Sequence, residues 1–300
     1  MRRINNIKGG FYMAVMYLAK LSMSSDIYKF YEETSLFDDY LKKVYLAINN
    51  KHTIQDEFEN TYKFNSLIYD NNDYSIAGRF SKIYKGSVES YDWDKDQPIN
   101  SEEKDLSSSI NFYFDLNSQL ISYTASRDFG YKSFLRIFKE YIESYLKDDN
   151  IKVAVELLIN DEDLKKEINK LKYIEEINFT IIPPNPPNKE EFDKLFGDRA
   201  PIIYESETTQ YSETYSVKNK SDNKGIKFVN YFDRIVSVIK DGYGTVSAKG
   251  VNYSNNTETI SSQNNAPQKI SINNKEKNNI NYIKDKGKSE IIKYIGNKIE

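Results

Sequence analysis

Three carboxylates are placed where they could hold catalytic metal ions. Asp115 ends the strand-like segment 110–115, Asp161 follows the alternating segment 151–159, and Glu140 belongs to a helical segment between them. Carboxylates that converge at strand ends can bind two Mg²⁺ ions, which stabilise the attacking and leaving oxygens of a phosphodiester. These residues therefore predict one alternative function, a metal-dependent nuclease, in which Mg²⁺ would be the cofactor.

Each of these carboxylates also has a structural explanation. Asp161 opens the segment DEDLKKEINKLK (161–172), where an Asp is a favourable helix N-cap. Glu140 alternates with lysines, as on an ordinary solvated face. The order of strands and helices resembles that of RNase H-like nucleases, but the segment YSIAGRFSKIYKG (74–86) lacks the central Asp of such a site. The sequence therefore favours a non-enzymatic protein without catalytic residues or a cofactor.

Residue usage excludes several other kinds of catalysis. The 300-residue chain has no cysteine and one histidine, His52. Disulfides, thiolate chemistry and Cys-ligated zinc are therefore excluded, and any Ser-His-Asp triad would have to use His52. We expect this histidine at the exposed end of a helix. The lack of cysteine fits a reducing cytoplasm, and no apolar run approaches the roughly 18 residues of a membrane span, so no membrane partner is expected.

Basic residues offer a candidate nucleic-acid surface. Arg79 and Lys82 lie on one expected strand, and Arg127 and Lys132 lie near the start of an expected helix. Strand alternation places Arg79 and Lys82 on opposite faces of the sheet, which weakens a single patch. The net charge of −3 provides no general attraction to phosphate. Nucleic-acid binding at these four residues is a prediction with a plain alternative, a solvated surface of mixed charge.

Hydrophobic periodicity predicts an α+β fold, a mixed β-sheet with helices packed on it. Residues 88–108 are polar and acidic, contain the only tryptophan, Trp93, and are expected to form a long exposed loop. The other expected elements are helices over 35–48, 130–147, 161–172 and 225–242, strands over 62–70, 74–86, 151–159 and 174–182, and hairpins over 110–126 and 243–262.

The predicted domain organisation is a single domain over residues 13–262, with its core in 60–187. Residues 263–300 form a basic tail, which we expect to be mobile with a last helix at 288–299; from Ala266 onward it contains eight lysines and four acids. Residues 1–12 are expected to be an untranslated leader. Lys8-Gly9-Gly10 can be encoded by a bacterial ribosome-binding sequence, and Met13 follows at a short spacing.

The segment NFTIIPPNPPN (178–188) joins a β-rich run to two proline pairs. Proline has no N–H and restricts the residue before it, so this segment reads as the end of a strand that leads to a helix near 190–196. The alternative is a proline-rich docking motif for an SH3-like partner, but such ligands usually carry a flanking Arg or Lys that is missing here. The strand exit is the favoured interpretation.

Several of these segments, in this order, resemble a bacterial family catalogued as domain of unknown function 4747. In that family a Gly-Arg strand, a hairpin, a strand with a Pro-Asn-Pro exit and a late glycine-containing segment recur. The matching segments here are 76–83, 111–128, 171–188 and 239–252, with Pro184-Asn185-Pro186 as the exit. More loosely, the layout is similar to that of the phage-exclusion protein RexA. That similarity implies DNA binding and phage defence, and neither resemblance supplies catalytic residues.

The function expected from these observations is a non-enzymatic component of a bacterial anti-phage defence or abortive-infection system. It would sense nucleic acid or a phage protein in the cytoplasm, as a homo-oligomer or with an effector encoded by a neighbouring gene. The alternatives are the metal-dependent nuclease and a protein-interaction subunit. An exposed aromatic patch around Trp93 would mark the interaction subunit.

Overall fold

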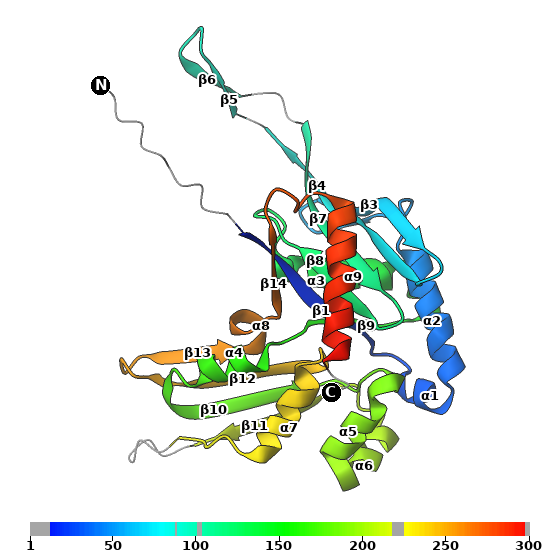
Figure 1. The fold of residues 1–300 in the computed structure, drawn as a ribbon, viewed down its shortest axis with the longest axis vertical. Coiled ribbons are helices and arrows are strands. Elements are labelled where there is room, and N and C mark those ends of the chain that lie inside the picture. Colours follow the sequence, from blue (N-terminus) through cyan, green and yellow to red (C-terminus); the bar gives the residue numbers. More distant parts are fainter. Residues whose placement is uncertain (1–12, 88, 101–103, 218–224, 298–300) are drawn as a thin grey trace.

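The structure is a computed structural model that describes residues 13–87, 89–100, 104–217 and 225–297 (Figure 1). The expected α+β class is confirmed. The first sheet has the order β14 (Lys269–Asn273), β1 (Met13–Met23), β8 (Leu120–Thr124), β7 (Lys104–Asp115), β4 (Ser75–Gly86), β3 (Thr61–Asp70) and β2 (Ile54–Gln55), and β9 (Val153–Leu157) also pairs with β1. All pairings between the named strands are antiparallel, whereas a mixed sheet was expected. Tight turns such as β3–β4 and β7–β8 connect only antiparallel neighbours.

Strand β1 organises this sheet. One edge of β1 pairs with β8, and the other edge pairs first with β14 and then with β9. Helices α1 (Ile27–Glu32), α2 (Thr34–Ala47) and α3 (Tyr131–Tyr145) enclose a core on one face of the sheet, where the rings of Phe64, Phe80 and Tyr141 meet. Helix α9 (Ile280–Gly296) covers the opposite face.

A second sheet has the order β11 (Tyr211–Ser216), β10 (Leu171–Ile181), β12 (Gly244–Asn252) and β13 (Thr257–Ser261). Its helices are α4 (Asp161–Ile168), α5 (Lys189–Phe196), α6 (Ala200–Glu205), α7 (Asn230–Ile239) and α8 (Ser262–Asn265). Ile177, Phe179 and Ile235 belong to a buried cluster distinct from that of the first sheet. The region expected to be one domain, 13–262, therefore contains two sheets, each with a core of its own.

The segment expected to be a long loop, 88–108, contains regular structure. Strands β5 (Glu89–Asp92) and β6 (Gln97–Asn100) form a separate hairpin, and β7 begins at Lys104. The ladder between β4 and β7 runs from Ser75–Asp115 out to Gly86–Lys104 and carries the hairpin away from the body (Figure 1). The polar composition concealed these strands because neither face of the hairpin is buried in a core.

The segment expected to be a mobile tail is part of the fold. Strand β14 belongs to the first sheet, and helix α9 packs against that sheet. Helix α9 spans Ile280–Gly296, where a helix over 288–299 was expected, and it buries Ile283, Gly287 and Ile291. Asn279 caps its start by accepting a hydrogen bond from the amide of Tyr282 at 3.3 Å. The proposed leader, residues 1–12, lies outside the described residues. Among the described residues, no helix is long and apolar enough to span a bilayer.

Close packing of α9 against the sheet depends on Gly287. A Cβ atom there would collide with the hydroxyl of Ser122 and approach the ring of Tyr113, and both of these residues are buried. In an exposed helix, Gly→Ala stabilises by about 1 kcal/mol. We expect Gly287→Ala to lower the free energy of unfolding instead, by about 1–2 kcal/mol, because overpacking costs more than the gain in helix propensity. Urea unfolding measures the difference.

Gly296→Ala is the matched control, since a Cβ placed at this last residue of α9 has no heavy atom within 4 Å among the described residues, apart from its chain neighbours and the backbone of its own helix. That variant should be as stable as the parent or slightly more stable. If Gly287→Ala and Gly296→Ala had the same effect, the close approach of α9 to the sheet would be disproved.

Candidate functional site

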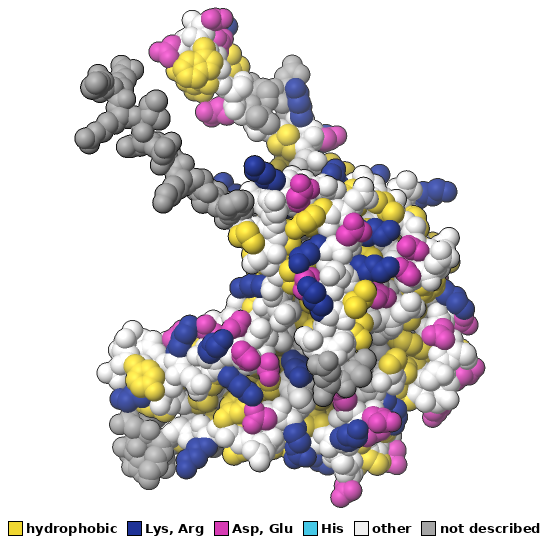
Figure 2. All heavy atoms as spheres, in the orientation of Figure 1, with side chains coloured by type: hydrophobic (Ala, Val, Ile, Leu, Met, Phe, Trp, Pro, Cys, Tyr) yellow, Lys and Arg dark blue, Asp and Glu magenta, His cyan; other side chains and the backbone are white. Residues whose placement is uncertain are grey.

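The β5–β6 hairpin, which we call the arm (residues 89–100), presents aromatic side chains to solvent. Trp93 is 84% exposed, and its ring lies edge-on to that of Tyr91 with centroids 4.9 Å apart. Ile99 is also exposed. Figure 2 shows hydrophobic side chains at the end of the arm beside acidic ones. An exposed tryptophan adds nothing to a core, so the arm is the first candidate for an interaction surface.

The turn that carries Trp93 is built by its own acids. The carboxylate of Asp92 accepts hydrogen bonds from the amides of Asp94 and Lys95 at 2.9 and 3.1 Å, and Asp96 accepts one from the hydroxyl of Tyr91. These contacts fix the turn locally, as Asp side chains commonly do. Residues 89–97 contain four acids and one lysine. The aromatic tip is therefore rimmed by negative charge, which disfavours phosphate.

Arg79 and Lys82, the two residues of β4 that are predicted to bind nucleic acid, are not brought together by the structure. Arg79 donates to the side chain of Asn111 at 3.2 Å and to the backbone carbonyl of Asn278 at 3.1 Å, so it joins β4 to the segment before α9. Lys82 leaves the opposite face of the strand and lies over the ring of Tyr84. Arg79 and Lys82 therefore do not share a patch.

The other two predicted residues lie close to α3. Arg127 is exposed in the loop before this helix. Lys132, also exposed, contacts the side chain of Asn264 in α8 and lies over the ring of Tyr131. Binding of nucleic acid at these residues stays a prediction.

The three predicted catalytic carboxylates have separate structural roles. Asp115 accepts hydrogen bonds from the amides of Asn117 and Ser118, at 3.0 and 3.3 Å, and so shapes the β7–β8 turn. Glu140 pairs with Arg136 at 2.8 Å on the exposed face of α3. Asp161 is the first residue of α4, and Asn160, not Asp161 as expected, is the N-cap that accepts from Asp163. No group of three or more His, Asp or Glu side chains in the described part of the chain could hold a metal ion.

The single histidine differs from its expected position at an exposed helix end. His52 is partly buried, and its ring lies edge-on to the rings of Tyr141 and Tyr145 at 4.7 and 5.3 Å. Its Nε2 atom is buried and has no hydrogen-bond partner among the described residues. Burial lowers the pKa of His52 below its ordinary value of 6.5. This environment favours the neutral imidazole.

Protonation of His52 should therefore oppose folding. Because the folded pKa lies below the unfolded one, the contribution of His52 to stability is complete above pH 6.5 and declines as the pH falls toward the folded pKa. As the only histidine, it gives a single set of imidazole resonances, so an NMR titration should return a pKa below 6.5. His52→Asn should remove this part of the pH dependence of unfolding. A measured pKa above 6.5 would contradict the buried environment.

The two sheets meet at Asn185, the centre of the Pro-Asn-Pro motif. Its amide oxygen accepts from the backbone N–H of Met23, and its amide nitrogen donates to the carbonyl of Leu21, both at 3.0 Å. The same nitrogen donates to Gln119 at 3.0 Å, and Asn185 is fully buried. The amide of Leu21 bonds to the carbonyl of Gln119, where β8 begins. The side chain of Asn185 thus continues the β8 edge of β1 as another strand residue would.

A polar cleft lies beside this junction. A cavity of about 170 Å³ is lined by Lys20 of β1, Tyr294 of α9 and three residues of connecting segments, Gln119, Asn188 and Asp241. Lys20 and Asp241 are 8% and 4% exposed. Lys20 donates to the carbonyl of Ser118 at 2.6 Å, and the hydroxyl of Tyr294 donates to Asp241 at 2.5 Å. Burial raises the pKa of Tyr294, so this hydroxyl keeps its proton.

Sequence reasoning missed Lys20 and Asp241. One signal was available for each residue. Lys20 interrupts the otherwise apolar strand MAVMYLAKLSM (13–23), and Asp241 stands beside Gly242, whose φ of 84° suits only glycine well. Buried charges in a cleft between two structural units are typical of binding sites.

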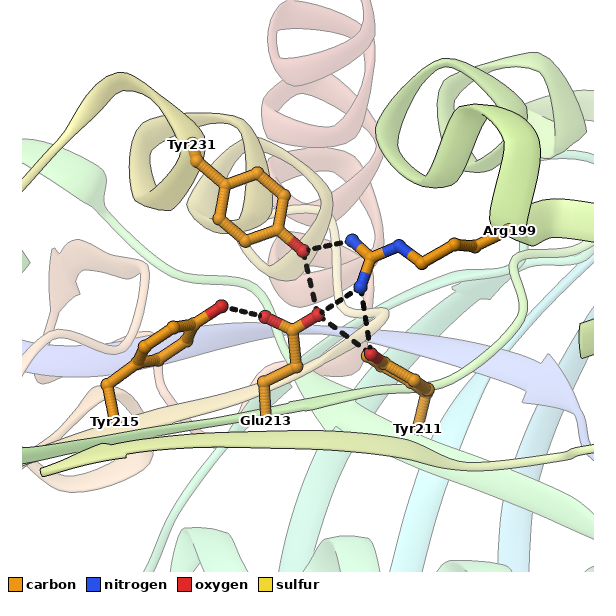
Figure 3. A network of polar contacts seen from close by, with 5 residues as sticks. All are labelled: Arg199, Tyr211, Glu213, Tyr215 and Tyr231. Atoms are coloured by element: carbon orange, nitrogen blue, oxygen red, sulfur yellow. Dashed lines mark hydrogen bonds and ion pairs between the residues drawn. The ribbon is translucent and has the colours of Figure 1, made fainter.

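A second buried network, drawn in Figure 3, lies on β11. One carboxylate oxygen of Glu213 accepts from Tyr211 and Tyr231, both at 2.8 Å, and from Arg199 at 3.0 Å, while the other accepts from Tyr215 at 2.5 Å. Burial would raise the pKa of Glu213, but these hydrogen bonds outweigh it and lower the pKa. A carboxylate with four donors is a poor base, so the network joins β11 to α7 and α6 and serves structure.

The comparison with protein families identifies this chain. A family model described as "Domain of unknown function (DUF4747)" matches residues 33–291. The chain belongs to this family. The match runs from α2 to α9 and confirms the resemblance inferred from the sequence, while the looser similarity to RexA stays a prediction. No match was found among curated proteins or solved structures. Asn185, Gln119 and Asp241, which lie in segments that carry the DUF4747 resemblance, meet at the junction of the sheets.

The junction predicts a large penalty for Asn185→Ala. This substitution removes the partner of the amide of Met23, of the carbonyl of Leu21 and of the side-chain oxygen of Gln119 in a buried site. Each unsatisfied buried group costs about 1–3 kcal/mol, so we expect a loss of about 3 kcal/mol or more in the free energy of unfolding. Asn178→Ala, which removes an exposed hydrogen bond to Thr214 and a long one of 3.5 Å from Thr180, should cost less than about 1 kcal/mol. Equal losses would show that the amide of Asn185 does not join the sheets.

Proposed function

We propose that this DUF4747 protein is a non-enzymatic interaction component of a bacterial anti-phage defence or exclusion system. It works in the cytoplasm and binds a protein partner, either a phage protein or an effector encoded nearby. The observation that carries the proposal is the exposure of Trp93 at the end of the arm. The defence setting is supported by the similarity of layout to RexA.

The chemistry of the arm supports a protein partner. Tryptophan and tyrosine are the commonest hot-spot residues of protein interfaces, and an exposed pair that already packs together loses little conformational entropy on binding. A two-stranded projection can also insert its tip into a recess of a partner. The acids around Trp93 favour a recess with a basic rim, since opposite charges steer association and raise the on-rate.

Binding of nucleic acid has less support from the described residues. Arg79 is bound to Asn111 and to the carbonyl of Asn278, and Lys82 lies on the other face of β4. A salt series with DNA and RNA, with and without Mg²⁺, separates the alternatives. Binding that weakens with salt and is lost in Arg127→Glu would favour a nucleic-acid sensor. Cleavage that requires Mg²⁺ and is lost in Asp161→Asn would favour the nuclease.

The arm predicts a variant that loses binding and keeps its fold. Protein partners are captured from phage-infected and uninfected cells, identified, purified and titrated against the chain. Trp93→Ala should raise the dissociation constant at least about 30-fold, as expected for a hot-spot residue that contributes about 2 kcal/mol to binding. The midpoint of thermal unfolding should not change, because Trp93 is 84% exposed.

Phe58→Ala is the matched control. Phe58 is 74% exposed, like Trp93, but it lies in the turn between β2 and β3 and is not part of the arm. This variant should bind the partner as the parent does. A partner that binds Trp93→Ala as tightly as the parent would refute the arm as the interaction surface, and plaque assays on cells that carry each variant would test the defence role.

A further inference from the structure

A charged recess that remains unexplained lies between α5, α7 and the end of α9, and Figure 1 shows how these three helices are arranged. It is a cavity of about 350 Å³ and includes Lys194 from α5, Arg234 from α7, Lys240 just after α7, and Asn297 just after α9. This volume falls within the range of small-molecule sites. The recess shares Asp241 with the cavity that contains Lys20, so the two cavities are neighbours.

The cations of this recess are arranged for an anion. Arg234, Ser237 and Lys240 are spaced by three residues, so they lie along one face at the end of α7. Neither Arg234 nor Lys240 makes an ion pair with a carboxylate of the described residues; the guanidinium of Arg234 lies over the ring of Tyr231 at 5.6 Å. The neighbouring acid on α7, Asp233, pairs with Lys165 of α4. Within the described residues, no carboxylate therefore neutralises the charge of Arg234 or Lys240.

Lys194 is held only weakly by its ion-pair partner. It pairs with Glu190 at 3.5 Å, but the two side chains are 77% and 87% exposed, and such a pair contributes little energy. Lys194 can therefore turn toward a ligand at small cost. It would add a third positive charge from a different helix, which makes the recess selective for an anion that spans α5 and α7.

The acids in the recess do not cancel this arrangement. Asp241 is buried at the floor and accepts the hydrogen bond of Tyr294, so its charge is already solvated by the protein. Glu191 is exposed and opens the first turn of α5. Among the described residues, the lining carries three cations and two anions. Asn297 adds an amide donor, whereas the hydroxyl of Ser237 already donates to the carbonyl of Arg234 at 2.7 Å.

We propose that this recess binds the phosphate group of a small molecule, with Arg234, Lys240 and Lys194 as its ligands. Guanidinium binds phosphate oxygens in pairs, ammonium binds them as a point charge, and the amide of Asn297 adds a further donor. The remainder of the molecule extends past Asp241 toward Gln119, Asn188 and Tyr294, which offer polar groups for recognition. Nucleotides have this combination of parts. The proposal is independent of the arm.

Isothermal titration of the full chain at low ionic strength tests the proposal, with pyrophosphate, AMP and ATP as probes and ³¹P NMR as a second readout. We expect saturable binding of at least one probe. The double variant Arg234→Gln/Lys240→Gln should weaken that binding at least tenfold, and it should fold normally because Arg234 is exposed and neither side chain has an ion-pair partner to lose within the described ranges.

The matched control removes the same charge elsewhere. Arg136→Gln/Lys139→Gln lies on the exposed face of α3 and should bind the probe as the parent does. Equal weakening in both double variants would show only a general effect of net charge and would overturn the proposal. Failure of all three probes to bind the parent at millimolar concentration would overturn it as well.

Discussion

One side-chain amide determines how the two sheets meet. The residue pairing between β1 and β8 ends at Lys20, and beyond it the carbonyl of Leu21 and the amide of Met23 would be left without partners on that edge. The amide of Asn185 supplies both the donor and the acceptor that they need. Proline on either side has no N–H to compete and holds the backbone extended. The Pro-Asn-Pro motif is therefore a means of ending one strand while satisfying the edge of another.

The position of the cleft follows from this junction. Because Asn185 fixes the segment 184–188 against β1 and Gln119, Asn188 faces the same recess as Lys20 of β1. Helix α9 adds Tyr294, whose hydroxyl bonds to Asp241 in the turn between α7 and β12. A buried charge needs such partners, since an unpaired charge away from water is costly. The charged residues of the cleft therefore come together only because the fold brings five distant segments of the chain into contact.

The sequence predicted the elements that have strong periodicity. Helix α3 and the β7–β8 hairpin bury full apolar faces, so their patterns are clear. Helix α9 was missed in part because it buries only Ile283, Gly287 and Ile291, a narrow stripe with a glycine at its centre. The arm was taken for a loop because its strands lack a buried face. The predicted carboxylates proved to be turn, helix-surface and helix-start residues, because a single sequence shows spacing but not which distant groups converge.

Strand β7 connects the two surfaces that are left for function. It begins at Lys104, beside the arm, and ends at Asp115, where the turn that lines the cleft starts. Its 12 residues span about 35–40 Å at about 3.3 Å per residue. A ligand in the cleft therefore cannot contact Trp93 itself, and sites so far apart usually act additively. Coupling between them would require β7 and its neighbours to have two arrangements, but the continuous ladder with β4 fixes one register along the whole strand. The fold is thus suited to independent recognition of a partner at the arm and of a small molecule at the junction.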